Sequence, residues 1–337
     1  MKPTQAITED FLERISQPSS RYHSDYLAYR RGEITRAELI DRLPHVAMIG
    51  DSVSTGIYVS KPWKTCREAR RCRGRDWFLN VDPKADIQSI SRRLEKLTPM
   101  VARHHGGIGA MVDDKSDRLW LSRRILGTRN FSGQINQLIR ARRFPDLMLI
   151  SIGHNNVDWA WRSPPDELEN PAGRLQRQRR AFRNNFARCL QTLIERSRGQ
   201  RRRVAIVVFG LVNFGSYFEG RAEAERRRSA DPSLYPHLET TYKYLVSFRP
   251  EHRGNVIRLA EMVNEELRMM VDEFNRELDG DANVQLRYSN ALATADLSRA
   301  ELFHAVDGWH ASAKGHNVLA EAAFADLGPS LKFLGMG

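Results

Sequence analysis

The chain of 337 residues lacks the features typical of membrane, disulfide-rich and metal-dependent proteins. No run of eighteen apolar residues is present, which argues against a membrane-spanning helix. Three cysteines are too few for a disulfide framework, and Cys66 and Cys72 have no nearby histidine or cysteine to complete a zinc site. The first twenty residues include Glu9, Asp10 and Glu13 and lack the apolar core of a signal peptide. We therefore expect a cytoplasmic protein without a metal or other cofactor.

Acidic residues are in the minority: the chain has 41 Asp and Glu residues and 53 Lys and Arg residues, which gives a formal charge of +12. Such a balance favours contact with polyanions. The excess is mostly arginine, concentrated in four runs: 67–75, 174–188, 198–203 and 221–228. Several of these runs are typical of solvated helix faces, and no nucleic-acid-binding motif accompanies them. We expect at most a weak association with anionic surfaces and no specific nucleic-acid partner.

Short apolar runs alternate with helical patterns along most of the chain. The expected buried strands are 46–49, 147–152, 204–209 and 284–288. The expected helices lie near 87–97, from 132 onward, and over 171–198, 256–278 and 312–327. Strands that alternate with helices in this way predict a parallel sheet covered on both faces. Ligands of such sheets bind at the carboxyl ends of the strands.

The helical pattern of residues 1–44 predicts an N-terminal extension, and residues 45–330 are expected to form one α/β domain. Two long segments of this domain, 58–108 and 210–254, are interpreted as insertions that wall a binding pocket. The second is rich in Gly, Pro, Tyr and Arg and is expected to be irregular. The last helix is expected to end at Gly328-Pro329.

Gly50-Asp51-Ser52 follows the first apolar run directly. A serine at the turn from strand to helix exposes its hydroxyl, and its backbone N–H lies at a helix N-terminus, where negative charge is favoured. Ser52 is therefore a candidate nucleophile, although a serine in such a position can also simply cap the helix. Nucleophilic attack requires a base within hydrogen-bonding reach of the hydroxyl.

Asp307-Gly308-Trp309-His310, near the end of the chain, supplies a candidate for that base. The carboxylate of Asp307 can orient one nitrogen of the His310 ring while the other nitrogen accepts the serine proton. An exposed pair on a loop would show the same spacing. The base assignment therefore depends on the other motifs.

Gly153-His154-Asn155-Asn156 follows the second apolar run. A side-chain amide at a strand end can donate a hydrogen bond to a developing oxyanion. The same four residues would also make a good turn. Together the three motifs provide a nucleophile, an oxyanion donor and a base at the edge where a parallel sheet binds its ligands.

These motifs resemble three conserved blocks of the SGNH/GDSL hydrolase superfamily, over roughly residues 45–330. The resemblance implies a flavodoxin-like three-layer α/β/α sandwich with a parallel sheet, and ester hydrolysis through an acyl-enzyme. It implies that Ser52 is the nucleophile and that Asn155 is an oxyanion donor. It also implies that Asp307 and His310 are the acid and base residues. The third block of the family usually ends in aspartate, where this chain has Asn156.

The second block of that family contributes a glycine N–H to the oxyanion site, and this chain has two candidates for it. Gly109, in the segment 106–110, resembles the lipase-like form of the block. Gly133, in the segment 130–133, resembles the thioesterase-like form. We predict Gly109, with Gly133 as the alternative.

The combined motifs predict a serine esterase or lipase-like acyl hydrolase. Its substrate would be a small-molecule, lipid or carbohydrate ester. An acyltransferase would use the same site, with an acceptor alcohol in place of water. A non-catalytic binding protein could also keep this fold, although three intact motifs favour an enzyme.

Overall fold

A computed structural model describes residues 9–56, 75–82, 85–112, 129–159, 171–239 and 249–336. Its centre is a five-stranded sheet in the order β2-β1-β3-β4-β5. The strands are β1 (His45–Gly50), β2 (Val101–His104), β3 (Leu147–Ser151), β4 (Val204–Phe209) and β5 (Val284–Ser289). All neighbouring strands run parallel. This order is that of flavodoxin-like sheets, so the expected fold class is confirmed.

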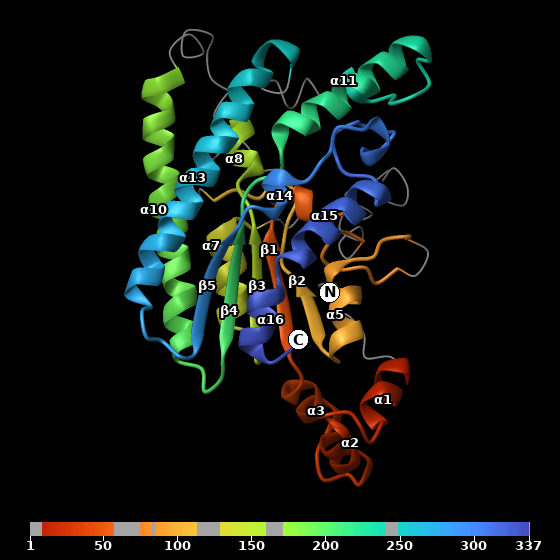
Figure 1. Cartoon of the computed structure of the whole chain (residues 1–337), viewed down its shortest axis with the longest axis vertical. Coiled ribbons are helices and arrows are strands. Elements are labelled where there is room, and N and C mark those ends of the chain that lie inside the picture. The colour runs from red at the N-terminus through yellow and green to blue at the C-terminus, as the bar shows by residue number, and fades with distance from the viewer. Residues whose placement is uncertain are drawn as a thin grey trace.

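Helices cover both faces of the sheet and make it the middle of three layers (Figure 1). One face carries α5 (Ile90–Leu97), α15 (Ala313–Ala325) and α16 (Gly328–Leu334), and the other carries α7 (Phe131–Ile139), α10 (Pro171–Arg198) and α13 (Arg253–Glu277). Successive residues of a strand point to opposite faces. Accordingly Val46 and Met48 belong to one hydrophobic cluster, and Ala47 and Ile49 to the other. The strands are apolar on both sides because both sides are covered.

Several helices and single helical turns lie toward the carboxyl ends of the strands, where α8, α11 and α14 are seen in Figure 1. They are η1 (Ser52–Ser54), α8 (His154–Trp159), α11 (Phe214–Ala230), η4 (Pro250–His252), α14 (Ala291–Thr294) and η5 (Ala300–Leu302). Ser52, Asn155, Asp307 and His310 all lie in or next to these elements. The fold thus brings the predicted motifs to one edge of the sheet.

Three helices precede the sheet: α1 (Glu9–Ser16), α2 (His23–Arg30) and α3 (Arg36–Arg42). They pack around Ile15 and Leu39 in a cluster that reaches the sheet through Val101. In Figure 1 they lie beyond the amino ends of the strands. These helices are therefore far from the edge that carries the motifs.

Strand β2 was not predicted, and it lies within the segment 58–108 that we interpreted as an insertion. Its four residues include Arg103 and His104, so it has no continuous apolar run. It is an edge strand, paired only with β1. Edge strands are often short and carry charged residues, which is why the apolar pattern missed this one.

Two further expectations were wrong. Part of the segment 210–254 is not irregular but forms α11. Asn213 caps the start of this helix, because its side chain accepts a hydrogen bond from the Ser216 N–H at 3.2 Å. The helix expected to end at Gly328-Pro329 does end just before it, as α15 (Ala313–Ala325), but it is not the last helix. Gly328-Pro329 begins α16, since proline is favoured in the first turn of a helix.

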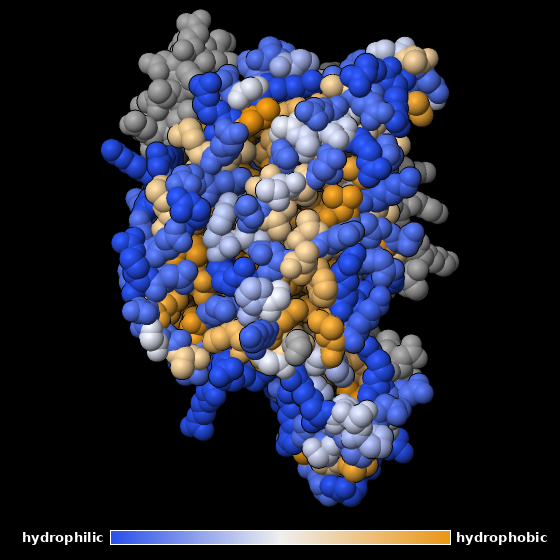
Figure 2. Space-filling model, in the orientation of Figure 1, coloured by the Kyte–Doolittle hydropathy of each residue, from blue (hydrophilic) through white to orange (hydrophobic). Residues whose placement is uncertain are grey.

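Some expectations concern residues outside the described part of the chain, among them Cys66, Cys72 and most of the arginine run 67–75. Within the described part, no helix is long and apolar enough to cross a membrane. The face seen in Figure 2 is mostly hydrophilic, with small apolar patches between charged side chains.

Candidate active site

Ser52 begins the helical turn η1 directly after β1. Its neighbour Asp51 caps this turn, because its Oδ1 accepts a hydrogen bond from the Val53 N–H at 3.1 Å. Only 7% of Ser52 is exposed. The predicted nucleophile therefore lies at the strand-to-helix turn that the sequence indicated, in a largely desolvated position.

The carboxylate of Asp51 also binds the end of β3. Its Oδ2 accepts hydrogen bonds from the backbone N–H groups of Gly153 and His154, both at 3.1 Å. The His154 ring contacts the same oxygen through Nδ1 at 2.9 Å, and its Nε2 accepts a hydrogen bond from the Val212 N–H at 3.2 Å. Since Nε2 is an acceptor, the proton of the neutral ring lies on Nδ1 and is donated to Asp51. The buried His154 side chain, which follows β3, thus links this segment to the segments that follow β1 and β4.

Asn155 is the second residue of α8. Its Nδ2 donates a hydrogen bond to the Ala110 carbonyl at 2.9 Å, and the Oδ1 of Asn156 accepts one from the Val112 N–H at 3.0 Å. A side-chain amide carries two hydrogens. One hydrogen of Asn155 binds the Ala110 carbonyl and thereby fixes the orientation of the amide.

The two second-block candidates have different surroundings. Gly109 has φ +69° and directly precedes Ala110, whose carbonyl holds Asn155. Gly133 lies in the first turn of α7, where an added Cβ would be 3.1 Å from the Cβ of Arg129. The structure thus brings Gly109, but not Gly133, next to a residue bound to the expected oxyanion amide.

Gln134, in the first turns of α7, holds the end of β1. Its Oε1 accepts a hydrogen bond from the Gly50 N–H at 3.0 Å, and its Nε2 donates to the Gly50 carbonyl at 2.9 Å. The end of β1 is therefore fixed to α7 two residues before Ser52.

Asp307 and His310 form a hydrogen-bonded pair in the turn between η5 and α15. The His310 Nδ1 is 2.6 Å from the Asp307 Oδ2, and the Asp307 Oδ1 accepts hydrogen bonds from the N–H groups of Trp309 and His310. Burial acts to raise the pKa of Asp307, but the His310 ring and these donors outweigh it and hold that pKa below its usual value. Asp307 therefore stays ionised and orients His310 with Nε2 turned away from it.

Two residues that the sequence did not single out hold this turn. Gly308 has φ +56°, and a Cβ there would lie 2.7 Å from the Leu238 Cδ1, so only glycine fits without a shift. Arg221 of α11 is 1% exposed and donates hydrogen bonds to the carbonyls of Gly308 at 3.0 Å and Asp307 at 3.4 Å. Arg221 belongs to the arginine run 221–228, and its side chain is buried rather than solvated.

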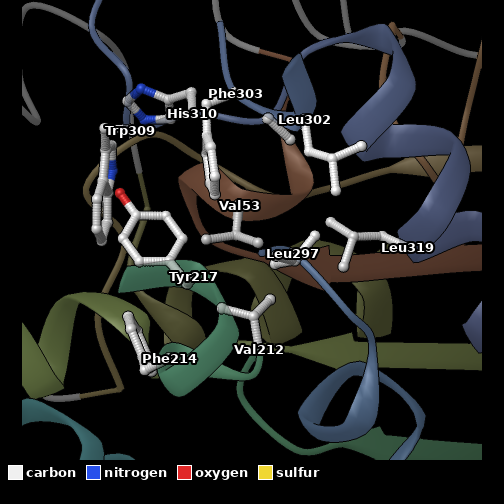
Figure 3. Close-up of a pocket in the computed structure, with 11 residues that line it drawn as sticks. Val53, Val212, Phe214, Tyr217, Leu297, Leu302, Phe303, Trp309, His310 and Leu319 are labelled. Carbon is white, nitrogen blue, oxygen red and sulfur yellow. The ribbon is translucent and has the colours of Figure 1, made fainter. Parts of the chain in front are cut away.

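A small cavity lies beside His310 (Figure 3). His310 lines it from the C-terminal turn, and Val53 lines it from the turn that contains Ser52. Aromatic rings of Tyr217 and Trp309 form one side. His310 and Val53, the residue that follows Ser52, therefore face the same cavity.

Within the described ranges, no group of three His, Cys, Asp or Glu side chains is arranged to hold a metal ion. The predicted site residues themselves carry a hydroxyl, an amide, a carboxylate and an imidazole. Some of the positive charge of the arginine run 174–188 is neutralised locally. Arg179 and Arg183 both form ion pairs with Glu266, whose side chain is 3% exposed.

A family model described as GDSL-like Lipase/Acylhydrolase matches residues 46–323. No curated protein matches this chain. The structure of the lipase Lip_vut3 from a goat rumen metagenome is 13% identical, with 84% of this chain and 96% of that chain covered and a TM-score of 0.42. A carbohydrate acetylesterase family member from Sinorhizobium meliloti is 12% identical, with 87% and 100% covered and a TM-score of 0.41. Phospholipase A1 from Streptomyces albidoflavus NA297 is 11% identical, with 84% and 98% covered and a TM-score of 0.45.

Proposed function

We propose that this protein is a serine hydrolase with Ser52 as its nucleophile. The chain belongs to the GDSL-like lipase/acylhydrolase family and is an ester-hydrolysing enzyme. His310 is the general base in this proposal, and Asp307 orients it. Asn155, the Ser52 N–H and the Gly109 N–H stabilise the oxyanion. The observation that carries this assignment is the hydrogen bond between an ionised Asp307 and His310, whose ring lines the cavity that Val53 also lines.

The reaction would proceed through an acyl-enzyme. The His310 Nε2 accepts the hydroxyl proton while the Ser52 Oγ forms a bond to the ester carbonyl carbon. The carbonyl oxygen becomes an oxyanion and accepts hydrogen bonds from the second amide hydrogen of Asn155 and from the two backbone donors. The carbon–oxygen bond to the alcohol then breaks, and His310 returns the proton to the leaving oxygen. Water repeats both steps on the acyl-enzyme and releases the acid.

The buried network around Asp51 supports this assignment. Asp51 is adjacent to Ser52, and its partner His154 is adjacent to Asn155. A hydrogen-bonded link between these neighbours restricts the distance between the nucleophile and the oxyanion amide. Preorganisation of this kind is what oxyanion stabilisation requires.

The test compares two serines of one turn. Ser52→Ala is expected to lower kcat for p-nitrophenyl acetate by at least about 10³-fold, as in other serine hydrolases. Ser54→Ala is the matched control, because the Ser54 hydroxyl donates only to the Asp51 carbonyl, at 2.9 Å. A folded Ser52→Ala protein with near-normal turnover would refute the assignment. An active-site phosphonate should label the wild-type protein at Ser52 and leave Ser52→Ala unlabelled.

An acyltransferase would share the acyl-enzyme, so the same assay can separate the two activities. If added alcohols increase substrate consumption and yield a new ester in place of the free acid, transfer is the main reaction.

We propose that the substrates are small-molecule, lipid or carbohydrate esters. The hydrolase would be one domain over residues 45–330, preceded by an N-terminal helical extension over residues 1–44. The arginine runs would add a weak, salt-sensitive attraction to anionic surfaces.

A further inference from the structure

The cavity beside His310 is small and almost wholly apolar. It is about 30 Å³ in volume, which is room for only two or three probes of water size at about 10–15 Å³ each. Val53, Val212 and Leu297 contribute aliphatic walls, Tyr217 and Trp309 contribute ring faces, and His310 contributes its imidazole (Figure 3). Space of this size and lining suits a single methyl group better than a polar group or a chain.

We propose that this cavity binds the acyl methyl group of the substrate, and that the enzyme therefore prefers acetyl esters. The inference rests on the proposed function, because it places the ester carbonyl between Ser52 and His310. A methyl group on that carbonyl would enter the cavity between Val53 and the His310 ring. A longer acyl chain would have to displace the walls.

The walls are held firmly. The Tyr217 ring packs edge-on against Phe303 and Trp309, in both cases with 4.8 Å between ring centroids. On the opposite side, the Val53 carbonyl accepts a hydrogen bond from the Trp77 Nε1 at 3.2 Å, and Trp77 is completely buried. Close-packed interiors of this kind resist expansion. We therefore expect the cavity to discriminate between acyl groups that differ by only a few methylenes.

The cavity suits the acyl side of the ester better than the alcohol side. The alcohol must leave for solvent before water can attack the acyl-enzyme, and an enclosed pocket beneath His310 would retain it. The acyl group stays bound to the enzyme through both half-reactions. An inner pocket that holds the acyl methyl therefore fits the order of events.

The first experiment measures kcat/KM of the wild-type enzyme for p-nitrophenyl acetate, butyrate and octanoate. We expect acetate to be preferred over butyrate by at least about tenfold, in line with the discrimination that a single methylene gives in tight pockets. If the octanoate is cleaved as well as the acetate, the proposal is overturned while the hydrolase assignment stands. If no ester of any length is cleaved, the hydrolase assignment itself fails.

A matched pair of substitutions at one wall position adds a second test. Val212→Ala enlarges the cavity and is expected to raise the butyrate-to-acetate ratio of kcat/KM by about tenfold. Val212→Ile fills the cavity and is expected to lower kcat/KM for acetate with little change in Tm. Leu267→Ala is the control: it removes a buried side chain on the other face of the sheet, so it should lower stability without changing the acyl preference. The proposal is wrong if Leu267→Ala and Val212→Ala shift the ratio equally.

A third arm separates the two sides of the ester. Methyl butyrate places a lone methyl on the alcohol side, and propyl acetate, an ester of the same composition, places it on the acyl side. We expect faster hydrolysis of propyl acetate. Faster hydrolysis of methyl butyrate would assign the cavity to the alcohol and overturn the proposal.

Discussion

The buried Arg221 offers the sharpest test of how the turn that carries Asp307 and His310 is held. Its guanidinium donates hydrogen bonds to the carbonyls of Asp307, Gly308 and Leu238 at 3.4, 3.0 and 3.3 Å. Arg221→Met keeps much of the aliphatic stem and removes every donor. We expect the substitution to weaken the fold and to misplace the Asp307–His310 pair.

The magnitude follows from the groups left behind. A buried carbonyl without a partner destabilises a protein by about 1–3 kcal/mol. The Gly308 contact at 3.0 Å is a full hydrogen bond, and the other two are longer and count for less. The expected loss in the free energy of unfolding is therefore about 3–4 kcal/mol, near the range of about 3–5 kcal/mol for breaking one side of a buried ionic contact. Misplacement of His310 is expected to lower kcat by about tenfold to hundredfold.

Urea unfolding and ester hydrolysis measure the two effects separately. Arg227→Met is the matched control on the same helix, because the Arg227 side chain is 44% exposed and pairs with Glu223 one turn away. Such a pair contributes only about 0.2–0.5 kcal/mol. If Arg221→Met loses no more stability than Arg227→Met and keeps its kcat, Arg221 does not hold the turn that carries Asp307 and His310.

Two further predictions concern the oxyanion glycine and the buried histidines. Gly109→Ala forces an alanine into φ +69° near Asn155 and should lower kcat at least about tenfold. Gly133→Ala should change kcat no more than about twofold. If steady-state assays show the larger loss of kcat for Gly133→Ala, the second block is assigned to Gly133. Burial lowers the pKa of His45 and His316 to about 3, while an unfolded histidine titrates near 6.5. Between pH 7 and 5 the unfolded chain binds more protons, so the free energy of unfolding should fall with pH by about 2 kcal/mol per histidine. His316→Leu should flatten this dependence in urea titrations and His237→Leu, at an exposed position, should not; equal slopes in both variants would contradict the reasoning.

The sequence was sufficient for the parts of the fold that depend on local pattern. Three of the five strands, β1, β3 and β4, are apolar runs that are buried on both faces. The fourth predicted strand, β5, alternates buried and partly buried residues, because it lies at the edge of the sheet. The same pattern placed Ser52 and Asn155 at strand ends, since a motif directly after a buried strand must lie at the carboxyl edge of a parallel sheet. Their positions could be read without knowledge of distant contacts.

Other elements depend on contacts that no local pattern reveals. Strand β2 exists because its backbone pairs with β1, and its residues show no apolar periodicity of their own. Helix α11 carries Gly220, where an added Cβ would lie 2.4 Å from the Leu297 carbonyl. The glycine that weakens the helical pattern is thus explained by a segment 77 residues further along the chain.

Arg221 shows why an arginine run cannot be divided into solvated and structural residues by composition. Its acceptors are main-chain carbonyls, and a carbonyl leaves no trace in a sequence because every residue has one. Nothing distinguishes Arg221 from Arg227 until the turn at Asp307 is folded against α11. His154 is a more tractable case, because it is adjacent to Asn155 and follows a buried strand, as Asp51 follows another. Two polar side chains at the ends of neighbouring parallel strands must lie close together, so their contact could have been inferred from the strand order alone.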